Sequence, residues 1–111
     1  MRRRETSILI DVLSLLLSPF ERRGMTRAKA TEFYKSREWK ELRYAALKKY
    51  GARCMCCGTT PGYGARIVVD HIKPVRTHGH LRLAISNLQI LCNTCNRGKG
   101  SRCSKDWRPR P

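Results

Sequence analysis

The chain has 111 residues, with 24 Lys or Arg and 8 Asp or Glu, so its formal net charge is +16. A chain of this length forms one small domain with a small hydrophobic core. Such domains often need a bound metal ion or disulfides for added stability. Residues 1–53 carry 14 basic and 6 acidic side chains, and residues 54–111 carry 10 and 2, so each half has a net charge of +8. The positive charge is therefore spread over the whole chain and is not confined to a basic tail. This balance indicates a polyanionic partner, with nucleic acid as the first candidate and a merely cationic surface as the alternative.

The first thirty residues are expected to form an N-terminal extension, helical or separable, ahead of a domain at residues 31–111. Residues 8–17 have a helical pattern, and a proline and a glycine mark a break after them. Met25 is an alternative start of the chain, because the preceding "ERRG" has the composition of a ribosome-binding sequence translated as protein.

The same N-terminal stretch has some likeness to a signal peptide, since three arginines precede an apolar run. Asp11 interrupts that run, and no small-residue cleavage site follows it closely. The run is also shorter than the roughly 20 residues that cross a bilayer. We therefore expect a cytoplasmic protein with no membrane partner.

A helix is predicted over residues 36–50. Ser36 is a suitable N-cap, two lysines lie in the last turn, and Gly51 follows the end. Apolar side chains recur at helical spacing on one face, which is expected to be buried. These are Trp39, Leu42, Ala46 and Tyr50.

The second half of the chain is predicted to contain two strands and a helix. Residues 58–64 are turn-forming, and residues 65–72 are a strand by their β-branched content. A long loop at 73–87 leads to a short second strand at 88–92. A final helix is expected at 94–102, with two glycines near its end.

Two Cys-x-x-Cys pairs indicate a metal site. Two residues between cysteines let both thiolates of a turn face one ion, and two such turns complete a tetrahedral four-cysteine zinc site of structural type. The disulfide framework of a small secreted protein is the alternative. The expected ligands are Cys54, Cys57, Cys92 and Cys95, which leaves Cys56 and Cys103 as spare thiols.

Asp70 and His71 lie inside an apolar run between the two pairs. If zinc draws the pairs together, the first strand and the final helix become neighbours, which brings Asp70 close to Asn96. A carboxylate and an amide oxygen suit Mg²⁺ or Mn²⁺. His71 points the opposite way from Asp70 on a strand, so it is better placed as a base than as a ligand. The alternative is an ordinary buried polar pair.

The stretch "CMCCG…VVDHIKPV…SNLQILCNTCNRGKG" resembles the HNH endonuclease family, and the likeness covers roughly residues 33–107. The resemblance implies an α+β, zinc-stabilised ββα-metal fold with a preceding helix. It also implies a metal-dependent DNA endonuclease whose products are a 5′-phosphate and a 3′-hydroxyl. Small stand-alone members often belong to phages, so phage packaging proteins are expected partners by family analogy alone.

The resemblance gives each polar residue a role. Asp70 and Asn96 would hold the catalytic ion, His71 would be the general base, and Asn87 would orient its ring. Many members have His where this chain has Asn96, which bears on metal preference. Lys73, Arg97 and Lys99 are candidate clamps on DNA phosphates, with double-stranded DNA as the expected substrate.

A non-catalytic, zinc-stabilised DNA-binding module is the competing function. It accounts for the charge and the cysteines but leaves Asp70, His71 and Asn96 without roles. Cleavage of supercoiled plasmid in Mg²⁺ or Mn²⁺ separates the two.

Overall fold

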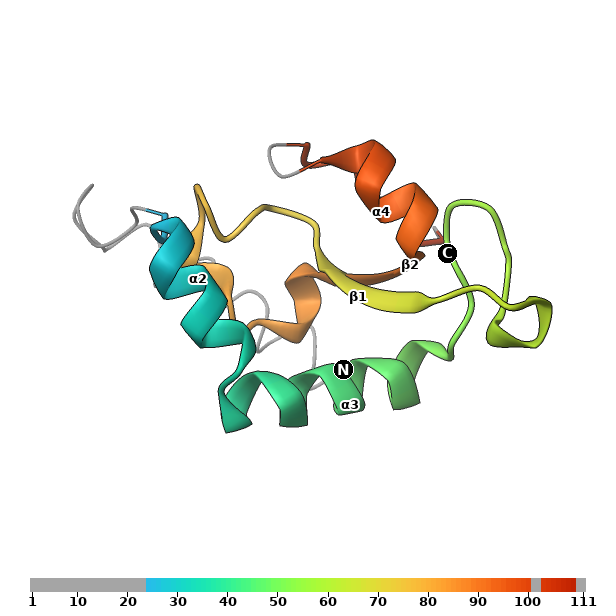
Figure 1. Ribbon diagram of the computed structural model, residues 1–111, viewed down its shortest axis with the longest axis horizontal. Coiled ribbons are helices and arrows are strands. Elements are labelled where there is room, and N and C mark those ends of the chain that lie inside the picture. The colour runs from blue at the N-terminus through green and yellow to red at the C-terminus, as the bar shows by residue number, and fades with distance from the viewer. Residues whose placement is uncertain (1–23, 101–102, 110–111) are drawn as a thin grey trace.

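The computed structural model describes residues 24–100 and 103–109, so the predicted helix at 8–17 lies outside the described residues. Three α-helices and two strands follow one another along this part of the chain (Figure 1). They are α2 (Arg27–Tyr34), α3 (Arg37–Tyr50), β1 (Ile67–His71), β2 (Leu88–Cys92) and α4 (Asn93–Lys99). The predicted long loop contains the short 3₁₀ turns η2 (Gly79–Leu81) and η3 (Ile85–Asn87), and η1 (Pro61–Tyr63) precedes β1.

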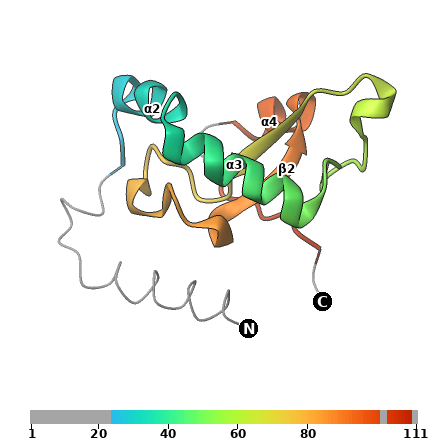
Figure 2. The ribbon, with the colours of Figure 1, turned by 90° about the horizontal axis from the view of Figure 1, so that it is seen from below.

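The two strands pair antiparallel, with Asp70 opposite Gln89 and His71 opposite Leu88. The hairpin lies between α3 on one side and α4 on the other, as both ribbon views show (Figures 1 and 2). The protein is therefore a small α+β domain of two strands and flanking helices. Both predicted strands are confirmed, although β1 begins at Ile67 rather than at residue 65.

Helix α3 has the ends and the buried face that the sequence predicted. The Ser36 hydroxyl accepts a hydrogen bond from the Trp39 amide at 3.2 Å, and Gly51 ends the helix with φ 82°. Trp39 and Ala46 are buried, and Leu42 and Tyr50 are half-buried against the core. The core cluster comprises Phe33, Trp39, Ala46, Val69, Leu88 and Ile90.

Helix α2 was not predicted, because its short, mostly polar sequence carries little periodicity. The Thr26 hydroxyl caps it by accepting from the Lys29 amide at 3.2 Å. Only Ala30 and Phe33 of its eight residues are buried. The helix spans residue 30, where we divided the chain into an extension and a domain.

The final helix is shorter than predicted. α4 starts at Asn93, where the Cys92 sulfur caps it, and ends at Lys99. Gly100 then takes φ 75°, a left-handed value that ends a helix readily. Within the described residues, no helix has the length and apolar character needed to cross a membrane.

Candidate active site

The four predicted zinc ligands lie in one cluster. The sulfurs of Cys54, Cys57, Cys92 and Cys95 are all within 4.8 Å of one another. The Sγ atoms of Cys57 and Cys92 are 3.8 Å apart. Four sulfurs arranged tetrahedrally about 2.3 Å from zinc would be about 3.8 Å apart, so the spacing fits this ion.

The surroundings of the cluster also suit a cation. The Cys57 amide donates to Cys54 Sγ and the Cys95 amide donates to Cys92 Sγ, each at 3.4 Å. Burial raises the pKa of Cys54, but backbone amides, with that of Cys57 foremost, outweigh burial and lower its pKa to about 6. The neighbouring Cys92 thiol raises the pKa of Cys95. A cation bound at the cluster would deprotonate its cysteine ligands, because a metal binds the thiolate form.

Asp70 faces α4 and is tied to it by an ion pair. Lys99 Nζ lies 2.9 Å from Asp70 Oδ2 and donates to the His71 carbonyl at 2.9 Å. The exposed fractions of the Lys99 and Asp70 side chains are 2% and 13%. The Gln89 amide, opposite Asp70 in the sheet, donates to the same carboxylate oxygen at 2.9 Å. Lys99 of α4 and Gln89 of β2 therefore both hold the Asp70 carboxylate.

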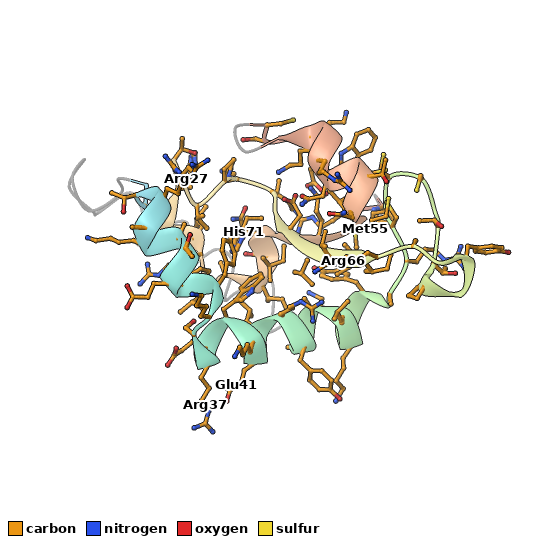
Figure 3. The ribbon with its side chains drawn as sticks, viewed as in Figure 1. Arg27, Arg37, Glu41, Met55, Arg66 and His71 are labelled. Carbon is orange, nitrogen blue, oxygen red and sulfur yellow. The ribbon has the colours of Figure 1, made fainter. Side chains whose placement is uncertain are left out.

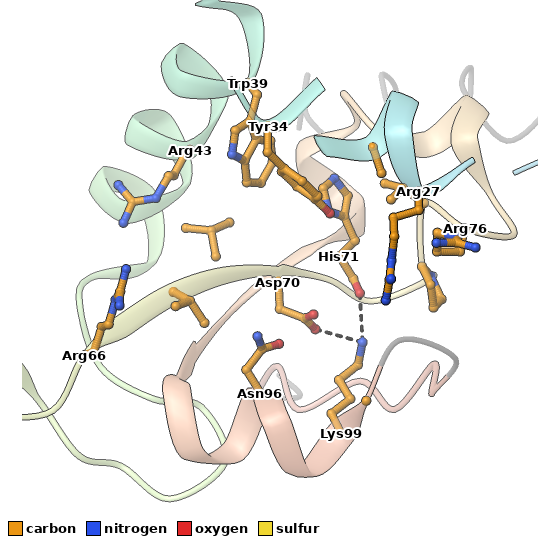
Figure 4. A pocket seen from close by; sticks show the side chains of 16 residues that line it. Arg27, Tyr34, Trp39, Arg43, Arg66, Asp70, His71, Arg76, Asn96 and Lys99 are labelled. Carbon is orange, nitrogen blue, oxygen red and sulfur yellow. Dashed lines mark hydrogen bonds and ion pairs between the residues drawn. The ribbon is translucent and has the colours of Figure 1, made fainter. Parts of the chain in front are cut away.

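Asn96 lies beside Asp70 at the wall of a cavity of about 660 Å³ (Figure 4). Both side chains line this cavity, one from α4 and the other from β1. Strand β1 and the final helix, α4, therefore lie side by side, as the sequence predicted. A carboxylate and an amide oxygen together suit a hard divalent ion.

His71 points to the other face of β1, toward α2 and α3 (Figure 3). Its ring is stacked on Trp39, with centroids 4.9 Å apart and planes at 26°. The residue is buried, with an exposed fraction of 4%. Burial is the main cause that lowers the pKa of His71 below its ordinary value, which keeps the imidazole neutral at pH 7.

The two ring nitrogens of His71 have different partners. Nε2 lies 2.9 Å from the Arg82 carbonyl, which can only accept, so Nε2 carries the proton in the neutral ring. Nδ1 is therefore the unprotonated nitrogen. It lies 3.4 Å from the Tyr34 hydroxyl, which also lines the cavity. This tautomer leaves Nδ1 as the proton acceptor of the site.

Asn87 holds the backbone directly after His71. Its side-chain oxygen accepts from the Lys73 amide at 2.9 Å, and its nitrogen donates to the Lys73 carbonyl at 3.0 Å. The Asn87 carbonyl accepts from the Ile72 amide at 2.8 Å. Asn87 therefore fixes the end of β1, whereas the Arg82 carbonyl and the Tyr34 hydroxyl contact the imidazole ring.

The three basic residues singled out from the sequence lie in different surroundings. Lys99 lines the cavity and is bound to Asp70. Lys73 and Arg97 are exposed and do not line it. Four arginines that the sequence analysis missed do line it, and no local motif links them. They are Arg27, Arg43, Arg66 and Arg76.

Comparisons with known proteins agree with this geometry. The model of the HNH endonuclease family matches residues 54–102. A solved structure, the HNH endonuclease of the deep-sea thermophilic bacteriophage GVE2 with manganese ion, is 36% identical with a TM-score of 0.57. The match covers 65% of this chain and 78% of that one. This chain belongs to the HNH endonuclease family.

The family assignment makes the protein a nuclease, with nucleic acid as its substrate, and confirms the resemblance inferred from the cysteine and Asp-His motifs. No curated protein matches the chain. The matched segment of this HNH endonuclease contains the four cysteines, Asp70, His71, Asn87 and Asn96, and it excludes α2 and α3.

Proposed function

We propose that this HNH endonuclease hydrolyses DNA phosphodiester bonds with His71 as general base and one Mg²⁺ or Mn²⁺ ion bound by Asp70 and Asn96. The observation that carries the proposal is the pairing of His71 Nε2 with the Arg82 carbonyl. It leaves Nδ1, which lies 3.4 Å from the Tyr34 hydroxyl, as the ring nitrogen that can accept a proton from water at the cavity that Asp70 and Asn96 also line.

The protein groups divide the work. His71 accepts the proton of the attacking water, Trp39 and the Arg82 carbonyl hold the ring, and Asn87 fixes the end of the strand. Asp70 and Asn96 would hold the divalent ion. When bound, such an ion stabilises the charge that develops on the phosphoryl oxygens and the leaving group.

We assign structural zinc to the four-cysteine cluster. The gathering of the four sulfurs within 4.8 Å of one another and the two amide donors to sulfur support this assignment. All six cysteines are free thiols, and the four that gather at one point favour a metal over the secreted, disulfide-bonded alternative.

Double-stranded DNA, bound chiefly through its phosphates in the cytoplasm, is the proposed substrate. The net charge of +16 supports binding to a polyanion, and the arginines around the cavity supply donors for phosphate. Phage packaging proteins remain proposed partners by family analogy.

Incubation of zinc-loaded protein with supercoiled plasmid in Mg²⁺ or Mn²⁺ tests the proposal. Cleavage with 5′-phosphate ends supports it. If purified, folded protein cuts plasmid with none of the divalent metals, the nuclease proposal fails and the non-catalytic DNA-binding module is favoured.

Replacing Asp70 is expected to remove the catalytic ion and to destabilise the fold for a separate reason. Asp70→Asn takes away the carboxylate ligand, so Mn²⁺ association measured by calorimetry should be lost or strongly weakened. It also leaves the buried Lys99 ammonium without its counter-ion, which costs about 3–5 kcal/mol of unfolding free energy.

Two further variants separate these effects. Asp70→Asn with Lys99→Met should recover most of the thermal stability but not the Mn²⁺ association. Lys99→Met alone keeps the carboxylate and should keep Mn²⁺ association. If the double variant binds Mn²⁺ as tightly as the parent, Asp70 is not a ligand of the ion.

A further inference from the structure

The four cavity arginines form two pairs on opposite sides of the proposed centre. Arg27 and Arg76 lie on one side of Asp70 and His71, and Arg43 and Arg66 lie on the other (Figure 4). All four are exposed. They come from four separate places in the sequence, so the fold alone assembles the two pairs.

The first pair, Arg27 and Arg76, is fixed by contact between two backbone segments. The Met25 amide donates to the Val75 carbonyl at 2.9 Å, just before α2 begins. A Cβ atom at Gly24 would lie 1.6 Å from the Arg76 carbonyl oxygen, so these backbones touch. The start of α2, where Arg27 lies, is thereby held against the loop that carries Arg76.

The second pair, Arg43 and Arg66, is set by α3 and by the start of β1. Arg66 immediately precedes β1, and Arg43 lies one turn beyond the buried Trp39 on α3. A strand rises about 3.3 Å per residue, so the four steps from Arg66 to Asp70 cover about 13 Å. This spacing along β1 places Arg66 at a different part of the cavity wall from Asp70.

None of these arginines is neutralised within the part of the chain that the structure describes. The ion pairs there are Arg37 with Glu41, Lys99 with Asp70, and Arg108 with Asp106. Unpaired guanidinium groups around a cavity are suited to phosphate, which they bind by two parallel hydrogen bonds.

We propose that each arginine pair binds phosphate on one side of the scissile bond, so that a DNA strand crosses the cavity from the α2 side to the α3 side. The proposal rests on the proposed DNA substrate. It identifies α2 and α3, which lie outside the matched family segment, as parts of the substrate-binding surface.

Two double variants and a matched control test the proposal by DNA binding. Arg27→Gln with Arg76→Gln, and Arg43→Gln with Arg66→Gln, each remove two charges from the cavity. Lys40→Gln with Lys48→Gln removes two exposed charges of α3 that do not line it. Affinity for a DNA duplex is measured by fluorescence anisotropy against salt, with zinc-loaded protein and no other divalent metal.

Each cavity variant should lower the salt slope, the change of log affinity with log salt concentration, by about 1.8 units for two lost phosphate contacts. The control should change it by much less. Equal slopes in the control and a cavity variant would overturn the proposal. Because this measurement needs no cleavage, its result is independent of whether the protein proves to be the proposed nuclease.

Cleavage maps of a short, end-labelled duplex test the placement of the pairs on two sides. The parent should spare bonds near both ends, because a terminal bond lacks phosphates on one side. Each cavity variant should stop sparing one end, and the two variants should differ in which end that is. Identical maps for the two variants would overturn the two-sided arrangement.

A second inference comes from Gln89, whose side chain is completely buried. Its nitrogen donates to Asp70 Oδ2 at 2.9 Å and to the Lys105 carbonyl at 3.0 Å. Its oxygen accepts from the Trp107 amide at 2.7 Å. One amide thus joins the proposed metal ligand to the segment 103–109 and satisfies its own hydrogen-bonding groups in doing so.

Segment 103–109 has its own attachment to the domain. Arg108 Nη1 donates to the Ser86 carbonyl at 2.7 Å, and its guanidinium binds the Asp106 carboxylate at 2.9 Å. The backbone groups that hold Gln89 are therefore anchored independently of Asp70.

We infer that Gln89 is a positioning residue for Asp70, given the proposed metal role of Asp70. Gln89→Met, of similar length, should weaken Mn²⁺ affinity by roughly 10–100-fold, as loss of a hydrogen bond to a metal ligand typically does. Calorimetry is performed well below the unfolding temperature, with circular dichroism to verify the fold.

Arg108→Gln is the matched control, because it loosens the same segment without touching Gln89 or Asp70. It should lower the unfolding temperature but leave Mn²⁺ affinity within about twofold of the parent. Equal Mn²⁺ affinities in Gln89→Met and Arg108→Gln would reduce Gln89 to a structural residue and overturn the inference.

Discussion

Replacing His71 by Ala should lower the rate of plasmid cleavage by roughly two to four orders of magnitude, the usual contribution of a general base. The neutral ring has its proton on Nε2, where the Arg82 carbonyl accepts it, so Nδ1 is the atom that takes a proton from water. Asp70 and Asn96 are unchanged in this variant, so Mn²⁺ and DNA association should persist. Single-turnover cleavage at saturating Mn²⁺ measures the effect.

The same ring is also part of the core, because it is stacked on Trp39 at 4.9 Å. Alanine would leave a cavity there and an unpaired Arg82 carbonyl, which destabilises the fold. His71→Gln is therefore the better-matched variant, since its amide can still donate to that carbonyl but cannot act as a base. If folded His71→Gln protein cuts plasmid as fast as the parent, His71 is not the base.

The Tyr34 hydroxyl is the other group that contacts the His71 ring at Nδ1. It lies 3.4 Å from His71 Nδ1, and burial raises its pKa, as does the nearby Asp70 charge. The hydroxyl is therefore protonated at neutral pH, and it lies beside the nitrogen that takes a proton from water in the proposed mechanism.

The features that the sequence predicted are those with local signals. Two Cys-x-x-Cys spacings predicted the sulfur cluster. The helical spacing of apolar residues, with Ser36 and Gly51 at the two ends, predicted α3. The alternation of a strand predicted that Asp70 and His71 face opposite ways, and their partners, Lys99 and Trp39, lie on opposite faces of β1. Such signals span a few residues and need no knowledge of tertiary contacts.

What the sequence analysis missed depends on contacts between distant segments. Gln89 reaches Asp70 because the register of β1 and β2 pairs them, and a single glutamine in an apolar strand carries no sign of this. The buried ion pair of Lys99 with Asp70 was not predicted either, because it joins α4 to β1. The start of α2 lies beside the loop at Arg76 because Gly24 permits close approach.

Removing zinc should unfold the domain rather than merely inactivate it. Zinc binding to such four-ligand sites contributes roughly 10–16 kcal/mol, which is comparable with the whole stability of a small domain, about 5–15 kcal/mol. Cys92 both belongs to the cluster and caps α4, the helix that carries Asn96 and Lys99. Loss of the ion would thus release α4 from the hairpin, and with it one wall of the cavity.

Cys92→Ser tests this expectation, and Cys56→Ser is its control, because Cys56 is exposed and lies outside the four-cysteine cluster. Cys92→Ser should lose zinc, lose the helical circular dichroism signal and expose its remaining thiols to reagent. Cys56→Ser should keep the zinc content and unfolding temperature of the parent. A spectrum that stays unchanged after verified removal of zinc from the parent would show that the hairpin and helices hold together without the ion, and the structural role of the cluster would be wrong.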